Sequence, residues 1–271
     1  LAGMRDSQVA AMNSQRMGSI DTSVLQNMTA GQIQSMTTSQ IISLIDTQLA
    51  ALGTAQIASM KATQIKAIET RDLHGLTTGQ MEALTSTQVG AFSTNQLTAL
   101  SAAQLAAVET QDMLALSAKQ MSSLSASQVA GLSTTQINNL RPHQIAALTT
   151  DAVAAMTDDQ LQAMTSQQIG ALKTAQIQAM TSGQIAALGT AQLVGLSSQQ
   201  IGAFETRDLQ GLSTSQVAAL GVRQVSGFTS AQISNLSTTQ VAAFETQDLA
   251  ALSATQFTAL RSSQIQALST A

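Results

Sequence analysis

Cysteine, tryptophan and tyrosine are absent from this 271-residue sequence, which has only one proline and five phenylalanines. Without cysteine the chain can form neither disulfide bonds nor thiolate metal sites. Charged residues make up 10% of the sequence, and the 11 lysines and arginines do not cluster. Because nucleic-acid binding depends on clustered positive charge, we expect no nucleic-acid partner. No apolar run approaches the ~18 residues that a membrane span requires, so we expect no membrane span.

An eight-residue repeat runs through the chain. From Arg5 to Leu268 the sequence divides into 33 octads with no slip in register. Position 4 is glutamine in 26 octads and aspartate in four, positions 5 and 8 are always apolar, position 7 is always small, and positions 1 and 2 are mostly Ser or Thr. Over residues 77–108 the structural positions are Gln80, Gln88, Gln96 and Gln104 at position 4, Met81, Val89, Leu97 and Leu105 at position 5, and Leu84, Phe92 and Leu100 at position 8.

A longer period lies above the octad. Residues 69–76 read ETRDLHGL and residues 205–212 read ETRDLQGL, an offset of 136 residues or 17 octads. Further octads repeat at the same offset. We therefore predict two copies of one unit, residues 1–136 and 137–271, joined in a continuous solenoid without a linker.

The octad has the residue spacing of a helix start. Ser or Thr at position 1 and Gln at position 4 form a capping box, in which the hydroxyl accepts from the backbone N–H three residues on and the Gln side chain reaches back. Aspartate at position 4 is expected to serve similarly. Pro142 falls at the first helical position, where its missing N–H has no cost. Each octad thus predicts one helix of about two turns.

These helices cannot merge into one long helix. At 100° per residue, eight residues advance 80° past two turns, so the apolar pair at positions 5 and 8 would not form a continuous stripe. The helix should instead restart at each octad boundary, and small residues at position 7 should let neighbouring backbones approach closely. We predict an all-α solenoid of very short capped helices, in which each octad depends on its neighbours.

A β-solenoid with stacked glutamines is the alternative fold. It requires period-two alternation, whereas positions 5 and 8 have opposite parity. The abundant Ala, Leu and Met also favour helices over strands.

Four octads carry Glu-Thr-x-Asp at positions 1 to 4, and their paired carboxylates are candidate calcium ligands. The candidates are Glu69 and Asp72 in the first copy and Glu205 and Asp208 in the second. These octads lack the glycine and the dense oxygen ligands of calcium loops. The competing interpretation is that the acidic residues replace the usual helix cap.

No catalytic arrangement emerges from the remaining polar residues. His74 and His143 have no counterparts in the repeat, and the copy of His74 is Gln210, so we interpret both histidines as solvated surface residues. No Gly-x-Ser-x-Gly elbow or phosphate-binding glycine loop occurs, and the methionines fall mostly at positions 5 and 8 as core residues. We predict that the chain is not an enzyme and uses no cofactor.

Short segments resemble a known motif. LTTGQ at 76–80, LTSTQ at 84–88 and LSTTQ at 132–136 look like the LTxxQ motif of small periplasmic helical chaperones. The similarity covers five residues and coincides with the capping box, so that family's function is not carried over. The whole pattern is more similar to octad-repetitive segments of giant, adhesin-like secreted or surface proteins of Gram-negative bacteria, which implies an exported stalk.

The leading hypothesis is a structural repeat segment: an extended superhelical stalk, spacer or filament subunit of a large bacterial protein, at the cell surface or outside the cell. Its expected partners are the neighbouring repeats of the same chain and, in a filament, other copies. The alternative is an α-solenoid scaffold that binds a peptide or polymer in its groove.

Overall fold

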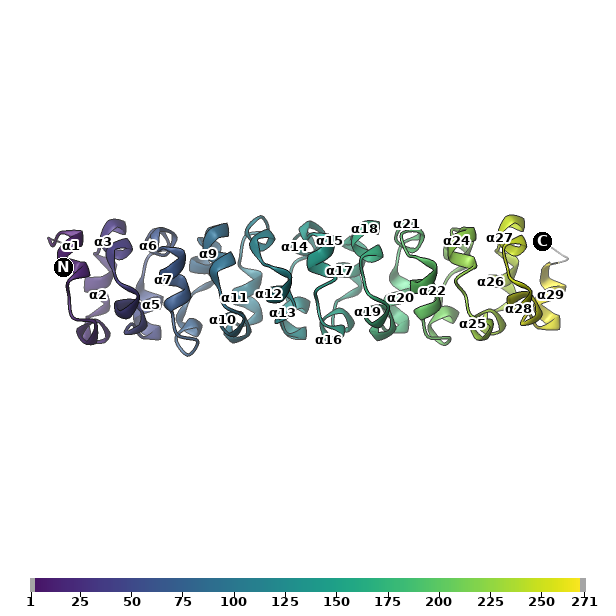
Figure 1. Cartoon of the computed structure of the whole chain (residues 1–271), viewed down its shortest axis with the longest axis horizontal. Coiled ribbons are helices and arrows are strands. Elements are labelled where there is room, and N and C mark those ends of the chain that lie inside the picture. The colour runs from purple at the N-terminus through teal and green to yellow at the C-terminus, as the bar shows by residue number, and fades with distance from the viewer. Residues whose placement is uncertain (1–2, 269–271) are drawn as a thin grey trace. The chain divides into compact units, whose positions relative to one another are not determined.

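A computed structural model describes residues 3–268, and every regular element within them is a helix (Figure 1). The all-α prediction is confirmed, and the β-solenoid alternative is wrong because the described chain contains no strand. The chain divides into two compact units, residues 1–140 and 141–271. The sequence-based boundary after residue 136 falls inside a helix, whereas the two units divide between complete octads. No described helix is both long and apolar enough to cross a membrane.

The first unit consists of short α-helices (α) and 3-10 turns (η), with one such element in each octad. In chain order these are α1 (Asp6–Ala10), η1 (Ser14–Ser19), α2 (Thr22–Gln26), α3 (Ala30–Ser35), α4 (Thr38–Ile42), α5 (Asp46–Ala51), α6 (Thr54–Ser59), α7 (Ala62–Ala67), η2 (Leu73–Gly75), α8 (Thr78–Glu82), α9 (Ser86–Ala91), α10 (Thr94–Ala99), α11 (Ala102–Ala106), η3 (Asp112–Ala115), α12 (Ala118–Met121), α13 (Ala126–Ala130) and α14 (Thr134–Asn139).

The second unit follows the same plan. Its elements are α15 (Pro142–Ile145), α16 (Thr150–Ala154), α17 (Asp158–Ala163), α18 (Ser166–Gly170), α19 (Thr174–Ala179), α20 (Ser182–Ala187), α21 (Thr190–Val194), α22 (Ser198–Ala203), η4 (Asp208–Gly211), α23 (Thr214–Ala218), α24 (Val222–Val225), α25 (Ser230–Asn235), α26 (Thr238–Ala242), α27 (Thr246–Ala250), α28 (Ala254–Thr258) and α29 (Ser262–Leu268). Pro142 opens α15 at the first helical position, as predicted.

The predicted capping box starts most of these helices. In α4 the cap residue Thr37 is extended (φ −75°, ψ 159°), and its hydroxyl accepts from the Gln40 N–H at 3.2 Å. The Gln40 Oε1 accepts in return from the Thr37 N–H at 2.8 Å. Where position 1 is Gly53 and has no hydroxyl, the Gln56 Oε1 still accepts from the Gly53 N–H at 2.7 Å. The hydrogen bond to the glutamine side chain is therefore present in more octads than the hydrogen bond to the position 1 hydroxyl.

The helices are shorter than the two turns predicted from the octad. The last helical residues close with a 3-10 bond, as when the Met36 N–H donates to the Ile33 carbonyl at 3.2 Å. Met36 at position 8 then adopts ψ 139°, and Thr37 at position 1 of the next octad is extended as well. Two consecutive extended residues take the place of the second turn and change the direction of the chain.

Within each unit the octads wind so that a helix packs against the one three octads later. In the first unit α3 packs on α6 and α4 on α7, and in the second α16 packs on α19. Hydrogen bonds from position 4 reach carbonyl groups 28 residues earlier, which is three and a half octads. One turn of the coil therefore takes between three and four octads.

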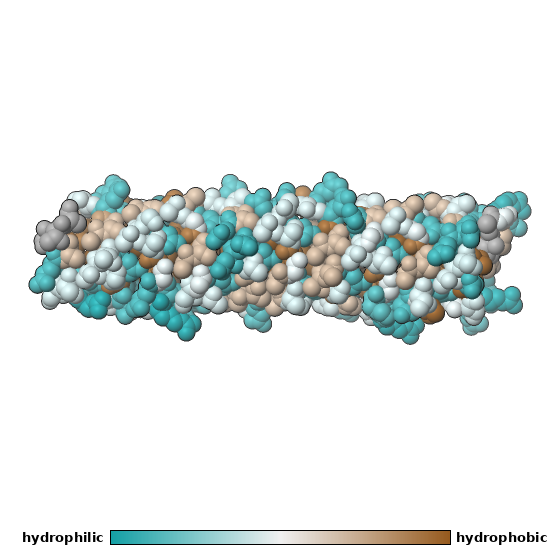
Figure 2. All heavy atoms as spheres, turned by 180° about the vertical axis from the view of Figure 1, so that it is seen from behind, coloured by the Kyte–Doolittle hydropathy of each residue, from teal (hydrophilic) through white to brown (hydrophobic). Residues whose placement is uncertain are grey.

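Positions 5 and 8 form the core, as predicted. Leu97 and Leu100 are 1% and 4% exposed, and their counterparts are buried along both units. Phe257 and Ile265, also at position 5, are exceptions and are 49% and 46% exposed. On the face shown in Figure 2, small and polar residues dominate, and strongly apolar side chains show only between them.

Small residues at position 7 allow the close backbone approach that the sequence predicts. A Cβ atom added to Gly195 would lie 2.6 Å from the carbonyl oxygen of Ser166, at position 2 of an octad in the preceding coil. A Cβ on Gly170, at position 6, would in turn lie 2.7 Å from the Gly195 carbonyl oxygen. The coils therefore approach each other closely at Gly170 and Gly195, where even a methyl group would overlap a backbone carbonyl oxygen.

Candidate functional site: the glutamine ladder and the aspartate octads

The glutamine at position 4 bonds in two directions. The Gln96 Oε1 accepts from the Ser93 N–H at 2.9 Å, which caps its own helix. The Gln96 Nε2 donates to the carbonyl oxygens of Ile65 at 3.0 Å and Ile68 at 2.8 Å, in the preceding coil. Gln96 is 2% exposed, and its amide is satisfied on both sides. One buried side chain thus starts a helix and ties it to the coil before it.

We call the Nε2 bonds to carbonyl groups 28 residues earlier the glutamine ladder. In the first unit it includes the pairs Gln40–Met12, Gln48–Ile20, Gln56–Met28, Gln64–Met36, Gln80–Leu52, Gln88–Met60, Gln104–Leu76, Gln120–Phe92, Gln128–Leu100 and Gln136–Val108. In the second it includes Gln176–Leu148, Gln184–Met156, Gln192–Met164, Gln200–Leu172, Gln216–Leu188, Gln224–Leu196, Gln232–Phe204, Gln240–Leu212, Gln256–Phe228 and Gln264–Leu236.

Sequence reasoning identified the capping role of these glutamines and missed the ladder. A signal for it exists in the octad, because position 4 is never glutamate although glutamate also completes a capping box. Glutamate offers the same acceptor but no N–H donor. The strict preference for the amide therefore indicates a second partner that needs a donor.

Aspartate octads depart from this pattern. Three of the four form 3-10 turns, η2, η3 and η4, and the fourth forms α27. None of the four has the capping box, so the expectation that aspartate replaces glutamine there is wrong. The aspartate side chain is one methylene shorter and has no donor. Instead, Asp112 accepts from the Ser86 hydroxyl, 26 residues earlier, and Asp208 accepts from the Ser182 hydroxyl in the same way.

The candidate calcium ligands do converge, but on an arginine of their own octad. Arg207 places its Nη2 2.7 Å from the Glu205 carboxylate and its Nε 3.5 Å from Asp208. The other copy repeats this arrangement, with Arg71 bonded to Glu69 and 3.5 Å from Asp72. The guanidinium supplies the positive charge that a cation would bring. Across residues 3–268 no group of three or more acidic or histidine side chains could hold a metal ion.

The two histidines occupy different surroundings. The His74 ring is 67% exposed, and its Nε2 lies 3.0 Å from the Asp46 carboxylate in the preceding coil. His143 is exposed on α15. The structure thus gives His74 a hydrogen-bond partner that the sequence interpretation, a solvated surface residue, did not include.

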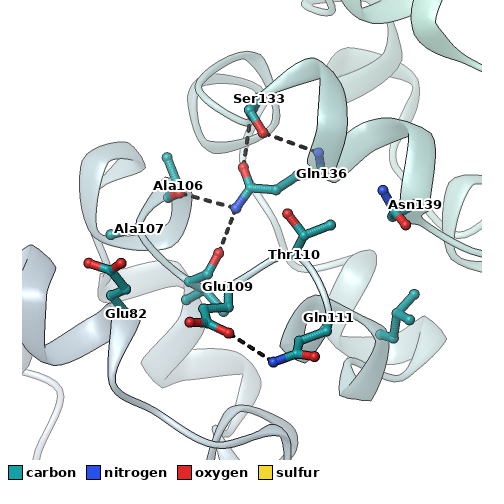
Figure 3. A pocket seen from close by; sticks show the side chains of 11 residues that line it. Glu82, Ala106, Ala107, Glu109, Thr110, Gln111, Ser133, Gln136 and Asn139 are labelled. Carbon is teal, nitrogen blue, oxygen red and sulfur yellow. Dashed lines mark hydrogen bonds between the residues drawn. The ribbon is translucent and has the colours of Figure 1, made fainter.

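An open groove of about 810 Å³ lies beside one aspartate octad of the first unit. Its lining residues are Glu82, Ala106, Ala107, Val108, Glu109, Thr110, Gln111, Leu114, Ser133, Gln136 and Asn139. Figure 3 shows Glu82 and Glu109 on one side of it and Asn139 on the other, with a ladder glutamine, Gln136, between coils. Gln111 Nε2 donates to the Glu109 carboxylate at 2.8 Å. The groove is lined by both polar and apolar residues and carries two carboxylates.

Comparison with known families gives a match along most of the chain from residue 65 onward. The ALTTAQ repeat matches residues 65–102, 105–142, 141–174, 161–190, 169–204, 201–238 and 241–271. The chain belongs to the ALTTAQ repeat family. No curated protein matches it.

The six letters of the ALTTAQ repeat correspond to positions 7, 8, 1, 2, 3 and 4 of the octad. Residues 83–88 read ALTSTQ and residues 171–176 read ALKTAQ. The motif therefore covers the close-approach position, one core position, the helix cap and the ladder glutamine. All of these are residues that build the coil, and the chain is a structural repeat protein.

Proposed function

We propose that this ALTTAQ repeat chain is a structural spacer, a stalk or filament element that holds other parts of a larger protein apart. The observation that carries the proposal is the glutamine ladder, because it gives the most regular polar residue of the octad a purely structural use. The buried apolar pair and the small residue at position 7 likewise serve packing between coils. A chain whose recurring positions all serve folding is suited to setting a distance rather than to catalysis.

The contacts between coils determine how the chain responds to a stretching force. Each coil is held by ladder bonds and apolar contacts to its neighbours only, so its stability follows nearest-neighbour terms. Load applied along the chain would release coils from a free end, and the remaining coils would keep their contacts. A spacer of this kind yields in increments and recovers when the load falls.

The setting we propose is the cell surface of a bacterium, or its exterior, as part of a large exported protein. The support is the resemblance to octad-repetitive exoprotein segments, together with the lack of cysteine and the low charge. Antibodies raised against the repeat should label intact cells of the source organism without permeabilisation. Labelling only after lysis would contradict this setting.

Single-molecule stretching of the full chain tests the spacer function. Releasing one coil of 28 residues frees about 100 Å of extended chain, at ~3.6 Å per residue. We expect many small, reversible steps of about this size or less. A single rupture of the whole chain without refolding would contradict a spacer built from nearest-neighbour contacts.

A binding scaffold is the second candidate, and the groove beside Glu109 favours it. Two carboxylates, Glu82 and Glu109, line this groove, and no lysine, arginine or histidine lines it. A peptide with lysine or arginine side chains is the complementary ligand. The matched control is the groove beside Glu69, where Arg71 already neutralises the glutamate. Titration with a short basic peptide should shift the NMR signals of Glu109 and leave those of Glu69 unchanged; equal shifts would remove this candidate.

A further inference from the structure

Asp248 has a buried carboxylate that forms no hydrogen bond. The residue is 1% exposed, and neither of its side-chain oxygens has a hydrogen-bond partner. These are the only such side-chain atoms among the described residues. Native proteins pair nearly all buried polar atoms, so an unpaired carboxylate requires an explanation.

The first copy of the repeat shows what is missing. Asp112 is the counterpart of Asp248, 136 residues earlier, and it accepts from the Ser86 hydroxyl. The counterpart of Ser86 in the second copy is Val222, which has no hydroxyl and is 44% exposed. One serine-to-valine difference between two closely similar units has therefore removed the partner of the buried acid.

The remaining aspartate octads keep a partner in one of two ways. Asp208 has both the Ser182 hydroxyl and Arg207, and Asp72 has Arg71. Asp248 has neither a serine nor an arginine partner, because Val222 replaces the serine and Gln247 stands at the position of the arginines. Gln247 donates instead to the Glu245 carboxylate at 2.7 Å.

The ionised form of Asp248 is therefore costly in the folded chain. Burial raises the pKa of the Asp248 carboxyl above its ordinary 3.8. A weak interaction with the Glu245 backbone N–H, which falls outside hydrogen-bond geometry, partly offsets the rise, and the Glu245 carboxylate adds to it. Besides Glu245, the charged group on the helices packed here is Arg223, exposed on α24. The adjoining helices α26 and α28 carry no charged residue.

We propose that the protonation state of Asp248 controls the contact between α27 and α24. The protonated acid keeps α27 packed against α24, and ionisation of the acid weakens this packing. At the equivalent place in the first unit, the Ser86 hydroxyl supplies the hydrogen-bond donor that Asp248 lacks.

The direction of the effect follows from linkage. The folded-state pKa of Asp248 lies above the unfolded value of 3.8, so the folded chain binds more protons between the two values. The contribution to stability is complete below pH 3.8 and is lost as the pH rises through the folded-state pKa. This is opposite to the usual behaviour of a paired carboxylate.

Carboxyl NMR on the full chain labelled with ¹³C at aspartate measures the effect, with Asp248→Asn identifying the signal. We expect Val222→Ser to lower the titration midpoint of Asp248, because the new hydroxyl can donate a hydrogen bond to the ionised carboxylate. An unchanged Asp248 midpoint in Val222→Ser would overturn the proposal.

Hydrogen exchange in the same samples reports the structural response. After correction for intrinsic exchange, the amides of α27 should open more often as the pH rises, by ~tenfold for each unit that the pKa exceeds the unfolded value. Asp248→Asn and Val222→Ser should suppress that rise. Opening of α27 that is independent of pH, or that persists in both variants, would contradict control by Asp248. Circular dichroism of each variant checks that the chain remains folded.

Discussion

The side-chain amide of Gln96 donates to the carbonyl oxygen of Ile68, 2.8 Å away and 28 residues earlier in the chain. The same amide group caps its own helix through Oε1. Local and non-local structure therefore depend on a single side chain, which explains why the octad tolerates variation at positions 3 and 6 but keeps glutamine at position 4. The ladder also relates the length of the octad to the number of residues in one turn of the coil, because each glutamine amide must lie opposite a carbonyl group of the preceding coil.

Replacement of Gly195 by alanine should destabilise the second unit by about 1–3 kcal/mol, since the new methyl group would overlap the Ser166 carbonyl oxygen at 2.6 Å. Gly183 is the matched control within α20, because its nearest neighbour would be the Thr181 hydroxyl at 3.9 Å. Gly183→Ala should raise stability by up to about 1 kcal/mol through helix propensity. Thermal unfolding followed by circular dichroism compares the two, and equal effects would show that the coils do not approach closely at position 7.

Truncation of Leu97 to alanine tests the core at position 5. Leu97 is 1% exposed, so the change should cost about 2–5 kcal/mol from lost burial and the cavity left behind. Thr98, the next residue, is exposed, and Thr98→Ala should change stability by less than about 0.5 kcal/mol. Hydrogen exchange of the surrounding octads is the measurement, because a long repeat array need not unfold in one step. Similar protection in both variants would contradict the assignment of position 5 to the core.

Chain length should decide whether the octads fold at all. One turn of the coil takes between three and four octads, so a peptide of residues 77–108 contains about one turn and no stacked pair of coils. We expect it to show no helical circular dichroism, whereas residues 5–140, with 17 octads, should be helical. A fully helical four-octad peptide would show that the helices are stable without neighbouring coils.

Much of the fold can be predicted from the sequence because it is local. The capping box lies within four residues, and the apolar pair at positions 5 and 8 lies within one octad, so both are visible without knowledge of the turn. The small residue at position 7 likewise indicated close approach, which Gly195 confirms. The helix length was overestimated, because the extended backbone at positions 8 and 1 has no distinct residue signature.

Non-local partners could not be predicted in the same way. The bond from Gln96 to Ile68 depends on how many octads make one turn, and that number follows from backbone angles at the octad boundary. The pairing of Asp112 with Ser86 depends on the same number. By contrast, Arg207 is adjacent to Asp208, and its role beside the candidate calcium ligands was open to prediction from the sequence.

Substitution of glutamate for Gln96, with Gln8→Glu as its control, tests the ladder most directly. Glutamate keeps the acceptor for the helix cap and loses the donor for Ile68. Gln8 is exposed and caps its own octad by accepting from the Arg5 N–H at 2.8 Å, and no ladder bond of its Nε2 is found among the described residues.

We expect Gln96→Glu to lower the stability of the coils around it by at least about 2 kcal/mol at pH 7, since buried carbonyl groups lose their donor and a charge is buried. The loss should be smaller at pH 4, where a protonated glutamate can donate again. Gln8→Glu should have little effect at either pH. Hydrogen exchange of the Leu97 and Leu100 amides is the measurement. Equal protection in Gln96→Glu and the unmodified chain at pH 7 would contradict the claim that glutamine joins the coils.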